Sequence, residues 1–101
     1  MKIYSHRANG YGHQENSAKA ILASLADNIS GVELDIRSTT DGQWCFFHDP
    51  ILDNNSESKG FISKKTAKEL RTVHLRDGQK LTFVKDMLPA FKKTKKEIIL
   101  E

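Results

Sequence analysis

The order of apolar and polar residues predicts short strands and amphipathic helices that alternate along the chain. Residues 2–5 are expected to form a first strand, and residues 8–16 a loop rich in glycine and asparagine. Apolar residues at helical spacing then predict an amphipathic helix over 17–27, for which Ser17 is available as N-cap. Over residues 32–37, aliphatic and charged side chains alternate with a period of two, which is typical of a strand that buries one face.

Two further strands are predicted in the rest of the chain. A tight turn at residues 40–42 is expected to lead into a third strand over 43–47, and residues 97–101 are expected to form a fourth. Strands that alternate with helices are the order of an α/β protein with a mainly parallel sheet. The pattern therefore predicts this class of fold in one domain of 101 residues.

Two helices are predicted between the third and the fourth strand. Thr66 and Glu69 have the spacing of a capping box, which indicates a helix that continues through about Val73. A second apolar pattern predicts a helix over 82–94. Pro89 lies inside that pattern, and we expect it to kink the helix or to divide it.

The net charge of +3 comes from a few late lysines. A lysine run at residues 92–96 with no interleaved aromatic residue is typical of the solvated end of a helix. The sequence therefore favours no nucleic-acid partner.

Cys45 is the single cysteine, so an internal disulfide is excluded. It stands between Trp44 and Phe46, where a thiol packs like a small apolar side chain. No stretch has the length of a signal peptide or of a transmembrane segment, and from this we expect a cytoplasmic protein.

Ionisable residues follow each predicted strand. In parallel α/β folds the chemistry gathers at the carboxyl ends of the strands. The residues that the sequence places there are His6, Arg7, Glu33, Asp35, His48, Asp49 and Glu101. The alternation puts Glu33 and Asp35 on one face of their strand, opposite the aliphatic residues.

Three of these residues, Glu33, Asp35 and Glu101, indicate a cation site. Carboxylates brought together cost several kcal/mol unless a cation neutralises them. Ligation by carboxylates alone suits Mg²⁺ or Ca²⁺ better than zinc. The alternative is that Glu33 and Asp35 simply face solvent on a half-exposed strand.

His6 and His48 are candidates for a general acid and base, because histidine titrates near neutral pH. Asp49, or Glu15 from the first loop, is placed to orient an imidazole. Arg7 is a candidate phosphate ligand, since its planar guanidinium matches phosphate geometry. The alternatives are ordinary surface or capping histidines and a surface ion pair at Arg7.

The order of these motifs resembles the glycerophosphodiester phosphodiesterase family. The matching elements are His6-Arg7, Glu15-Asn16-Ser17, Glu33-x-Asp35, the TTDG of residues 39–42, His48-Asp49, Leu52-Asp53, Lys59-Gly60, residues 66–70 and the final IILE. The opening motif of the family is HRG, and position 8 of this chain is alanine.

The resemblance implies a parallel (β/α) barrel of TIM type, of which about the first four strands lie in residues 1–101. It also implies hydrolysis of a glycerophosphodiester substrate to glycerol 3-phosphate and an alcohol, with one divalent cation, Mg²⁺ or Ca²⁺. The roles that it implies are metal ligands at Glu33, Asp35 and Glu101, an acid–base pair at His6 and His48, phosphate binding at Arg7, and support from Glu15 and Asp49.

Two other functions remain open at the level of the sequence. One is a non-catalytic half-barrel that acts as a binding or assembly module, with a second copy or a complementary half-barrel as its partner. The other is a phospholipase-D-like toxin or a phosphoinositide-type lipase, which would share the paired histidines and the Glu-x-Asp motif.

Overall fold

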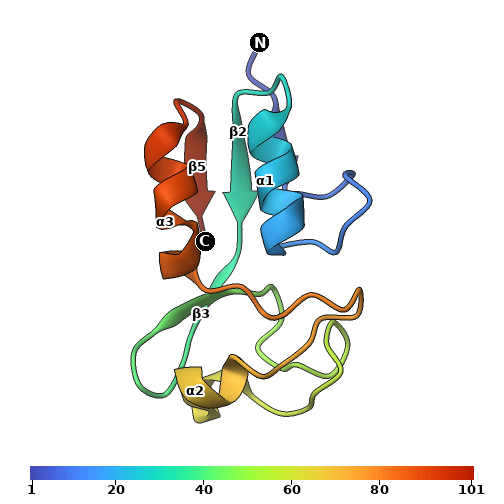
Figure 1. Cartoon of the computed structure of the whole chain (residues 1–101), viewed down its shortest axis with the longest axis vertical. Coiled ribbons are helices and arrows are strands. Elements are labelled where there is room, and N and C mark those ends of the chain that lie inside the picture. The colour runs from blue at the N-terminus through green and yellow to red at the C-terminus, as the bar shows by residue number, and fades with distance from the viewer.

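Three parallel strands form the sheet at one end of the molecule, in a computed structural model that describes residues 1–101. They are β1 (Tyr4–His6), β2 (Gly31–Leu34) and β5 (Glu97–Leu100), with β2 in the middle (Figure 1). The backbones of β2 and β5 approach closely, and a Cβ atom at Gly31 would lie 2.3 Å from the carbonyl oxygen of Glu97. Only glycine fits at this position.

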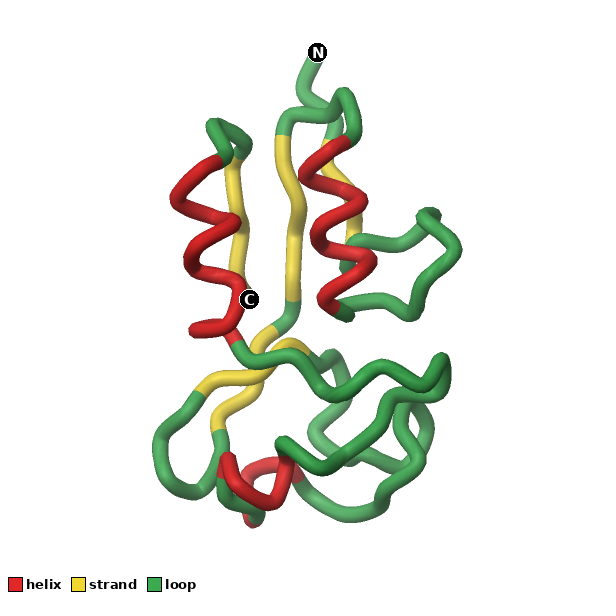
Figure 2. The backbone as a smooth tube through the Cα atoms, in the orientation of Figure 1, coloured by secondary structure: helices red, strands yellow, loops and turns green.

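One face of this sheet is covered by α1 (Ala18–Ala26) and α3 (Val84–Lys93), which lie side by side in Figure 2. Val32 and Leu34 point to this face and are buried together with Ile21 of α1 and Met87 of α3. The predicted alternation is confirmed over β2, because the two aliphatic residues enter the core while Glu33 between them does not. The strand predicted over 32–37 is shorter in the structure, since β2 ends at Leu34 and Ile36 begins a strand of another sheet. The core of this part therefore consists of one apolar stripe from each helix and the apolar face of the sheet.

The predicted third strand is not a member of the parallel sheet, and the expectation of four parallel strands is corrected to three. β3 (Ile36–Ser38) and β4 (Trp44–Phe46) pair with each other in an antiparallel hairpin. Residues 39–43 are too few to reverse the chain direction twice, since a parallel neighbour needs a crossover of about a dozen residues or more. A tight turn leads only to an antiparallel partner.

The residues from β3 to Phe83 form a second part with its own core. This part is mostly loop (Figure 2), with a short 3₁₀ helix η1 (Ile62–Lys64) and a single turn of helix α2 (Ala67–Leu70). Its core consists of nine buried residues: Cys45, Phe47, Leu52, Ile62, Leu70, Val73, Leu75, Leu81 and Phe83. Burial raises the pKa of the Cys45 thiol to about 12, so this cysteine packs as an apolar side chain.

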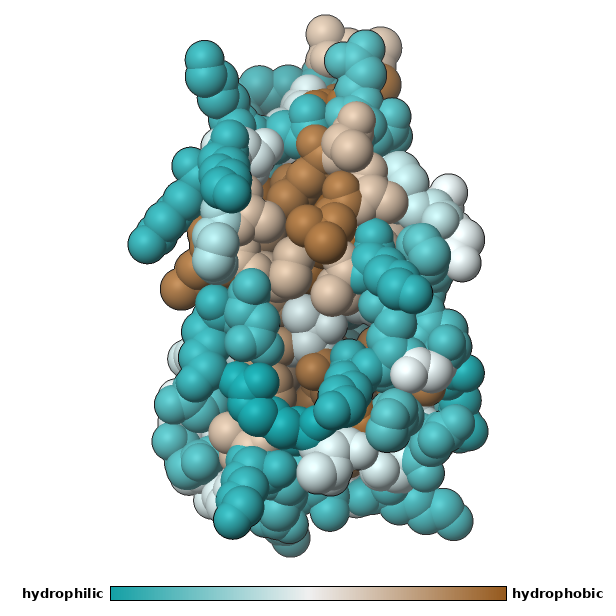
Figure 3. All heavy atoms as spheres, viewed as in Figure 1, coloured by the Kyte–Doolittle hydropathy of each residue, from teal (hydrophilic) through white to brown (hydrophobic).

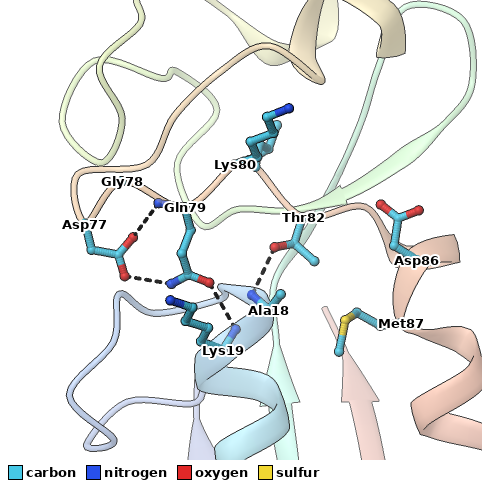
Figure 4. Close-up of a pocket in the computed structure, with 10 residues that line it drawn as sticks. Ala18, Lys19, Asp77, Gly78, Gln79, Lys80, Thr82, Asp86 and Met87 are labelled. Atoms are coloured by element: carbon cyan, nitrogen blue, oxygen red, sulfur yellow. Dashed lines mark hydrogen bonds between the residues drawn. The ribbon is translucent and has the colours of Figure 1, made fainter.

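The second part holds the N-terminus of α1. Helix N-termini leave backbone N–H groups without partners inside the helix. Thr82 accepts the Ala18 N–H at 3.0 Å and Gln79 accepts the Lys19 N–H at 3.0 Å, beside a cavity of about 650 Å³ (Figure 4). Ser17 accepts the Ala20 N–H at 3.2 Å, which confirms its predicted role as N-cap.

The helices of the second half differ from their predicted extents. The capping box of Thr66 and Glu69 is confirmed, but α2 ends at Leu70, because the chain then turns to bury Val73 in the core of the second part. Pro89 does not divide α3. Val84 and Phe91 pack on the core from either side of the proline, and this packing retains the helix despite the lost N–H.

Apolar side chains are also exposed on this molecule. Figure 3 shows a patch over α1 and α3, where Leu22, Leu25, Ala26 and Ala90 line a shallow groove. Leu100 of β5 is 43% exposed at the outer edge of the sheet. No helix here is both long enough and apolar enough to span a bilayer.

Candidate active site

Glu33, Asp35 and Glu101 meet at the carboxyl ends of β2 and β5. Each offers one carboxylate oxygen, and these oxygens lie within 4.8 Å of one another. The ladder between the strands continues past Leu34 and Leu100, since the Glu101 N–H donates to the Leu34 carbonyl at 2.9 Å. The Glu101 carbonyl accepts the Ile36 N–H at 2.8 Å, so the backbone of both strand ends is fixed.

The carboxylate cluster fits a hard divalent cation. One oxygen of Glu33, Oε1, is buried and has no hydrogen-bond partner. A buried carboxylate oxygen without a donor is costly, and a cation bound by carboxylates satisfies it. All three members of the donor set are oxygen ligands, which suits Mg²⁺ or Ca²⁺.

A tight turn after β1 brings Arg7 to this cluster. The Asn9 N–H donates to the His6 carbonyl at 3.0 Å, and both central residues, Arg7 and Ala8, have a φ of +56°. Two consecutive positive φ angles are those of a type I′ turn, which favours glycine or asparagine. Ala8 stands where the family motif has glycine, and it adopts the left-handed conformation nonetheless while fully buried.

The guanidinium of Arg7 lies between two carboxylates. Its Nε atom is 3.3 Å from Oδ2 of Asp35, and its Nη1 atom is 3.7 Å from Oε2 of Glu15. The backbone is held as well, because the Arg7 N–H donates to the Glu33 carbonyl at 2.7 Å. The turn and the two ion pairs together place one positive charge beside the three acidic groups.

The two histidines lie next to different members of the cluster. Nε2 of His6 is 3.4 Å from Oε2 of Glu33, and the side chain of His6 is 62% exposed. His48 follows β4 and lines a cavity of about 290 Å³ with Asp35 and Glu101. Its Nδ1 atom is 2.8 Å from Oδ1 of Asp49.

Two polar residues of the site had no predicted role. Asn16 binds Asp35 through its side-chain amide, and Arg37 donates from Nε and Nη2 to the main-chain carbonyl of His48, the first of these bonds at 3.0 Å. For Arg37 the signal was present, because a period of two puts it on the same face as Glu33 and Asp35. Asn16 belongs to the Glu15-Asn16-Ser17 element of the resemblance, but its contact with Asp35 could not be predicted, since that contact depends on the path of the first loop.

Residues 6–99 match the family described as the Glycerophosphoryl diester phosphodiesterase family. The chain belongs to this family. The match spans the turn at Arg7, the Glu-x-Asp motif and the hairpin that carries His48, which are the segments that the structure brings to one end of the sheet.

Several curated proteins and solved structures that are named as glycerophosphodiester phosphodiesterases resemble the chain. The chain is 33% identical to the glycerophosphodiester phosphodiesterase of Bacillus altitudinis over 70 residues, which is 69% of this chain and 29% of that protein. A glycerophosphoryl diester phosphodiesterase structure from Agrobacterium tumefaciens has a TM-score of 0.91 at 23% identity, over 98% of this chain and 41% of that one. A glycerophosphoryl diester phosphodiesterase structure from Parabacteroides distasonis has a TM-score of 0.84 at 26% identity. The match covers 98% of this chain and 37% of that one.

The chain spans about 30% of the length of the curated relatives that it matches. The structural relatives are TIM-barrel enzymes, so the three parallel strands with their two helices correspond to part of such a barrel. The acidic cluster stands at the carboxyl ends of these strands, which is the edge where TIM-barrel enzymes carry their active sites.

Proposed function

We propose that this chain carries the cation and phosphate site of a glycerophosphodiester phosphodiesterase, which hydrolyses its substrate to glycerol 3-phosphate and an alcohol. One observation supports this more than any other. In a chain of this family, three carboxylates converge beside Arg7, and a histidine adjoins the cluster through Glu33.

The residues that hold the cation in this proposal are Glu33, Asp35 and Glu101. The buried, unpartnered Oε1 of Glu33 supports this donor set. When bound, a divalent cation of the Mg²⁺ or Ca²⁺ type polarises a phosphoryl oxygen and neutralises the charge that develops on it.

Arg7 binds and orients the phosphate. Its guanidinium is kept beside the cluster by ion pairs with Asp35 and Glu15, and its buried Nε has no hydrogen-bond partner, so a donor is available for an anion. The same carboxylates compensate the charge of the Arg7 side chain, which is only about a quarter exposed. Glu15 thereby supports Arg7 rather than contacting the substrate.

His48 accepts the proton of the glycerol hydroxyl group that attacks phosphorus, and the phosphorus–oxygen bond to the alcohol breaks. Water then opens the cyclic phosphate to glycerol 3-phosphate. An ionised Asp49 only accepts hydrogen bonds, so the 2.8 Å contact requires the proton on Nδ1 of His48. In the neutral imidazole the other ring nitrogen then carries the lone pair, which is the form that a general base needs. His6, beside Glu33 and open to solvent, donates a proton to the leaving alkoxide.

The proposal is tested by measuring release of glycerol 3-phosphate from sn-glycero-3-phosphocholine by the full chain, with Mg²⁺ or Ca²⁺ and with a chelator. We expect any hydrolysis to require the cation and to have a bell-shaped dependence on pH. Because the chain spans about 30% of the length of its curated relatives, we expect weak or no activity from residues 1–101 alone and restored activity from a longer protein that contains them. His6→Ala and His48→Ala should each lower the rate about 10²–10⁴-fold, the usual contribution of general acid–base catalysis.

His13→Ala is the matched control, because His13 is an exposed histidine of the first loop that has no role in the proposal. A rate that falls equally in the control would contradict the assignment of the two histidines. Cation binding without any cleavage of the substrate by the longer protein would support the module hypothesis, in which the chain binds or assembles but does not catalyse.

A further inference from the structure

Asn16 is buried beneath the carboxylate cluster. Its side chain and backbone are 2% exposed, and its φ is +58°, a conformation that asparagine adopts more readily than most residues. Its N–H donates to the Arg7 carbonyl at 2.8 Å, so Asn16 closes the first loop against the turn that carries Arg7. A polar side chain in such a place requires partners.

Both ends of the Asn16 amide bind the same residue. Nδ2 donates to Oδ2 of Asp35 at 3.1 Å, and Oδ1 accepts the Asp35 backbone N–H at 3.1 Å. A carboxylate in place of the amide lacks the donor, and a hydrocarbon side chain lacks both groups. The pair of bonds therefore holds the side chain and the backbone of Asp35 at once.

We infer that Asn16 is a positioning residue for the cation centre, and that it acts by fixing which oxygen of Asp35 faces the cation. Oδ2 of Asp35 is held by Asn16 and is also 3.3 Å from Nε of Arg7. Neither of these two contacts involves Oδ1, which is left to serve as the ligand. This inference rests on the proposed function.

Partners of metal ligands orient the ligand and affect affinity for the metal, typically by 10–100-fold when they are changed. A residue that only closed the loop would affect stability but not the affinity for the cation. The two roles are therefore separable by measuring both quantities on the same variants.

Two substitutions isolate the side chain from the backbone. Asn16→Gly removes both hydrogen bonds, and glycine adopts a positive φ without strain. Asn16→Asp retains the shape and the acceptor but directs a second carboxylate at Oδ2 of Asp35. Asn28→Gly, at an exposed asparagine, is the matched control for the substitution by glycine, and Ser24→Ala, at a fully buried hydroxyl, is the control for loss of stability.

The experiment titrates each full-length variant with Mn²⁺, a hard cation that takes carboxylate ligands, and follows free Mn²⁺ by electron paramagnetic resonance at a temperature where circular dichroism shows all variants folded. We expect Asn16→Gly and Asn16→Asp to bind Mn²⁺ at least tenfold more weakly than the wild type and both controls. Wild-type affinity in either Asn16 variant would overturn the inference and leave the proposed function standing. Failure of the wild-type chain itself to bind Mn²⁺ would overturn both.

Discussion

Nε2 of His6 lies 3.4 Å from Oε2 of Glu33, its direct neighbour across the ladder of β1 and β2. The other oxygen of this carboxylate, Oε1, is buried and has no partner. Glu33 thus contacts a histidine with one oxygen, and its other oxygen is buried without a donor in a carboxylate that belongs to the acidic cluster. Its charge has a cost in the absence of a cation and is stabilising in its presence.

We predict that Ca²⁺ or Mg²⁺ raises the melting temperature of the chain, because a ligand of the native state alone stabilises that state. A cation present at a hundredfold excess over its Kd adds about 2.7 kcal/mol to the free energy of unfolding. Glu33→Gln or Asp35→Asn should abolish the increase. Glu57→Gln, at an exposed glutamate, serves as control in the same thermal scans. An equal increase in all variants would show that the cation binds elsewhere.

The left-handed conformation of Ala8 predicts an asymmetry between two substitutions. Ala8→Gly relieves about 1 kcal/mol of backbone strain. The substitution also removes a buried methyl group, which lowers the free energy of unfolding by about 0.8 kcal/mol. Glycine increases the entropy of the unfolded chain, which lowers the free energy of unfolding by about 0.4–1 kcal/mol. These effects nearly cancel, and urea denaturation should find the free energy of unfolding within about 1 kcal/mol of the wild type.

Ala8→Val, by contrast, should destabilise the chain by about 2–5 kcal/mol. A β-branched residue strains the positive φ, and two further methyl groups have no space at a position that is fully buried. A valine variant as stable as the glycine variant would contradict the turn geometry.

Asp41 predicts a loss of stability in acid. The Thr39 hydroxyl donates to its carboxylate at 2.5 Å and the Ala67 N–H at 3.0 Å, and these bonds hold the pKa of Asp41 below its ordinary value of 3.8. A carboxyl whose folded pKa is lowered stabilises the fold above its unfolded pKa, and the contribution disappears as the pH falls through the folded pKa.

Asp41→Asn should therefore lower the melting temperature at neutral pH, and the difference from the wild type should narrow below a pH of about 4. Thr39→Val, which removes the same bond from the donor side, should show the same trend. A difference that stays constant from neutral to acidic pH would indicate that the Asp41 charge is not the cause.

The outer edges of the sheet predict self-association. β1 and β5 each pair only with β2, and Leu100 lies exposed on β5. Open edges with apolar side chains favour pairing with another chain. Sedimentation at micromolar concentration should find dimers or larger species, and Leu100→Lys should shift them toward monomers. Leu22→Lys, at a leucine on α1 that is 51% exposed, should not shift them. Monomeric wild-type protein would contradict this prediction.

Local patterns account for what the sequence predicted well. The Ser17 cap, the capping box at Thr66 and the alternation around Glu33 depend on neighbours within a few residues, and each is present in the structure. The clustering of Glu33, Asp35 and Glu101 followed from one further assumption, that parallel strands end at the same edge.

The missed features depend on contacts between distant segments. The hairpin of β3 and β4 was assigned to the parallel sheet, although the short connection excluded it. The extent of α2 was overestimated because the helical pattern does not reveal that Val73 belongs to another core. Asn16 and Asp35 are nineteen residues apart, and their hydrogen bonds exist only once the first loop has closed.

The division of the molecule into two cores has a consequence for cooperativity. His48 and Asp49 follow β4, whose Cys45 lies in the nine-residue core and whose Phe46 lies in the other core, whereas His6 and Glu33 lie on the sheet. An opening of the second part therefore also removes Phe46 from the core that it shares with the sheet. Segments with separate cores open with separate free energies. Hydrogen exchange should therefore reveal an opening of the second part that moves His48 away from the acidic cluster. The amides of β2 around Glu33 should stay protected from exchange during this opening. In that open form the molecule holds its acidic cluster but lacks a proton acceptor, so the free energy of this partial opening sets the fraction of molecules with a complete site.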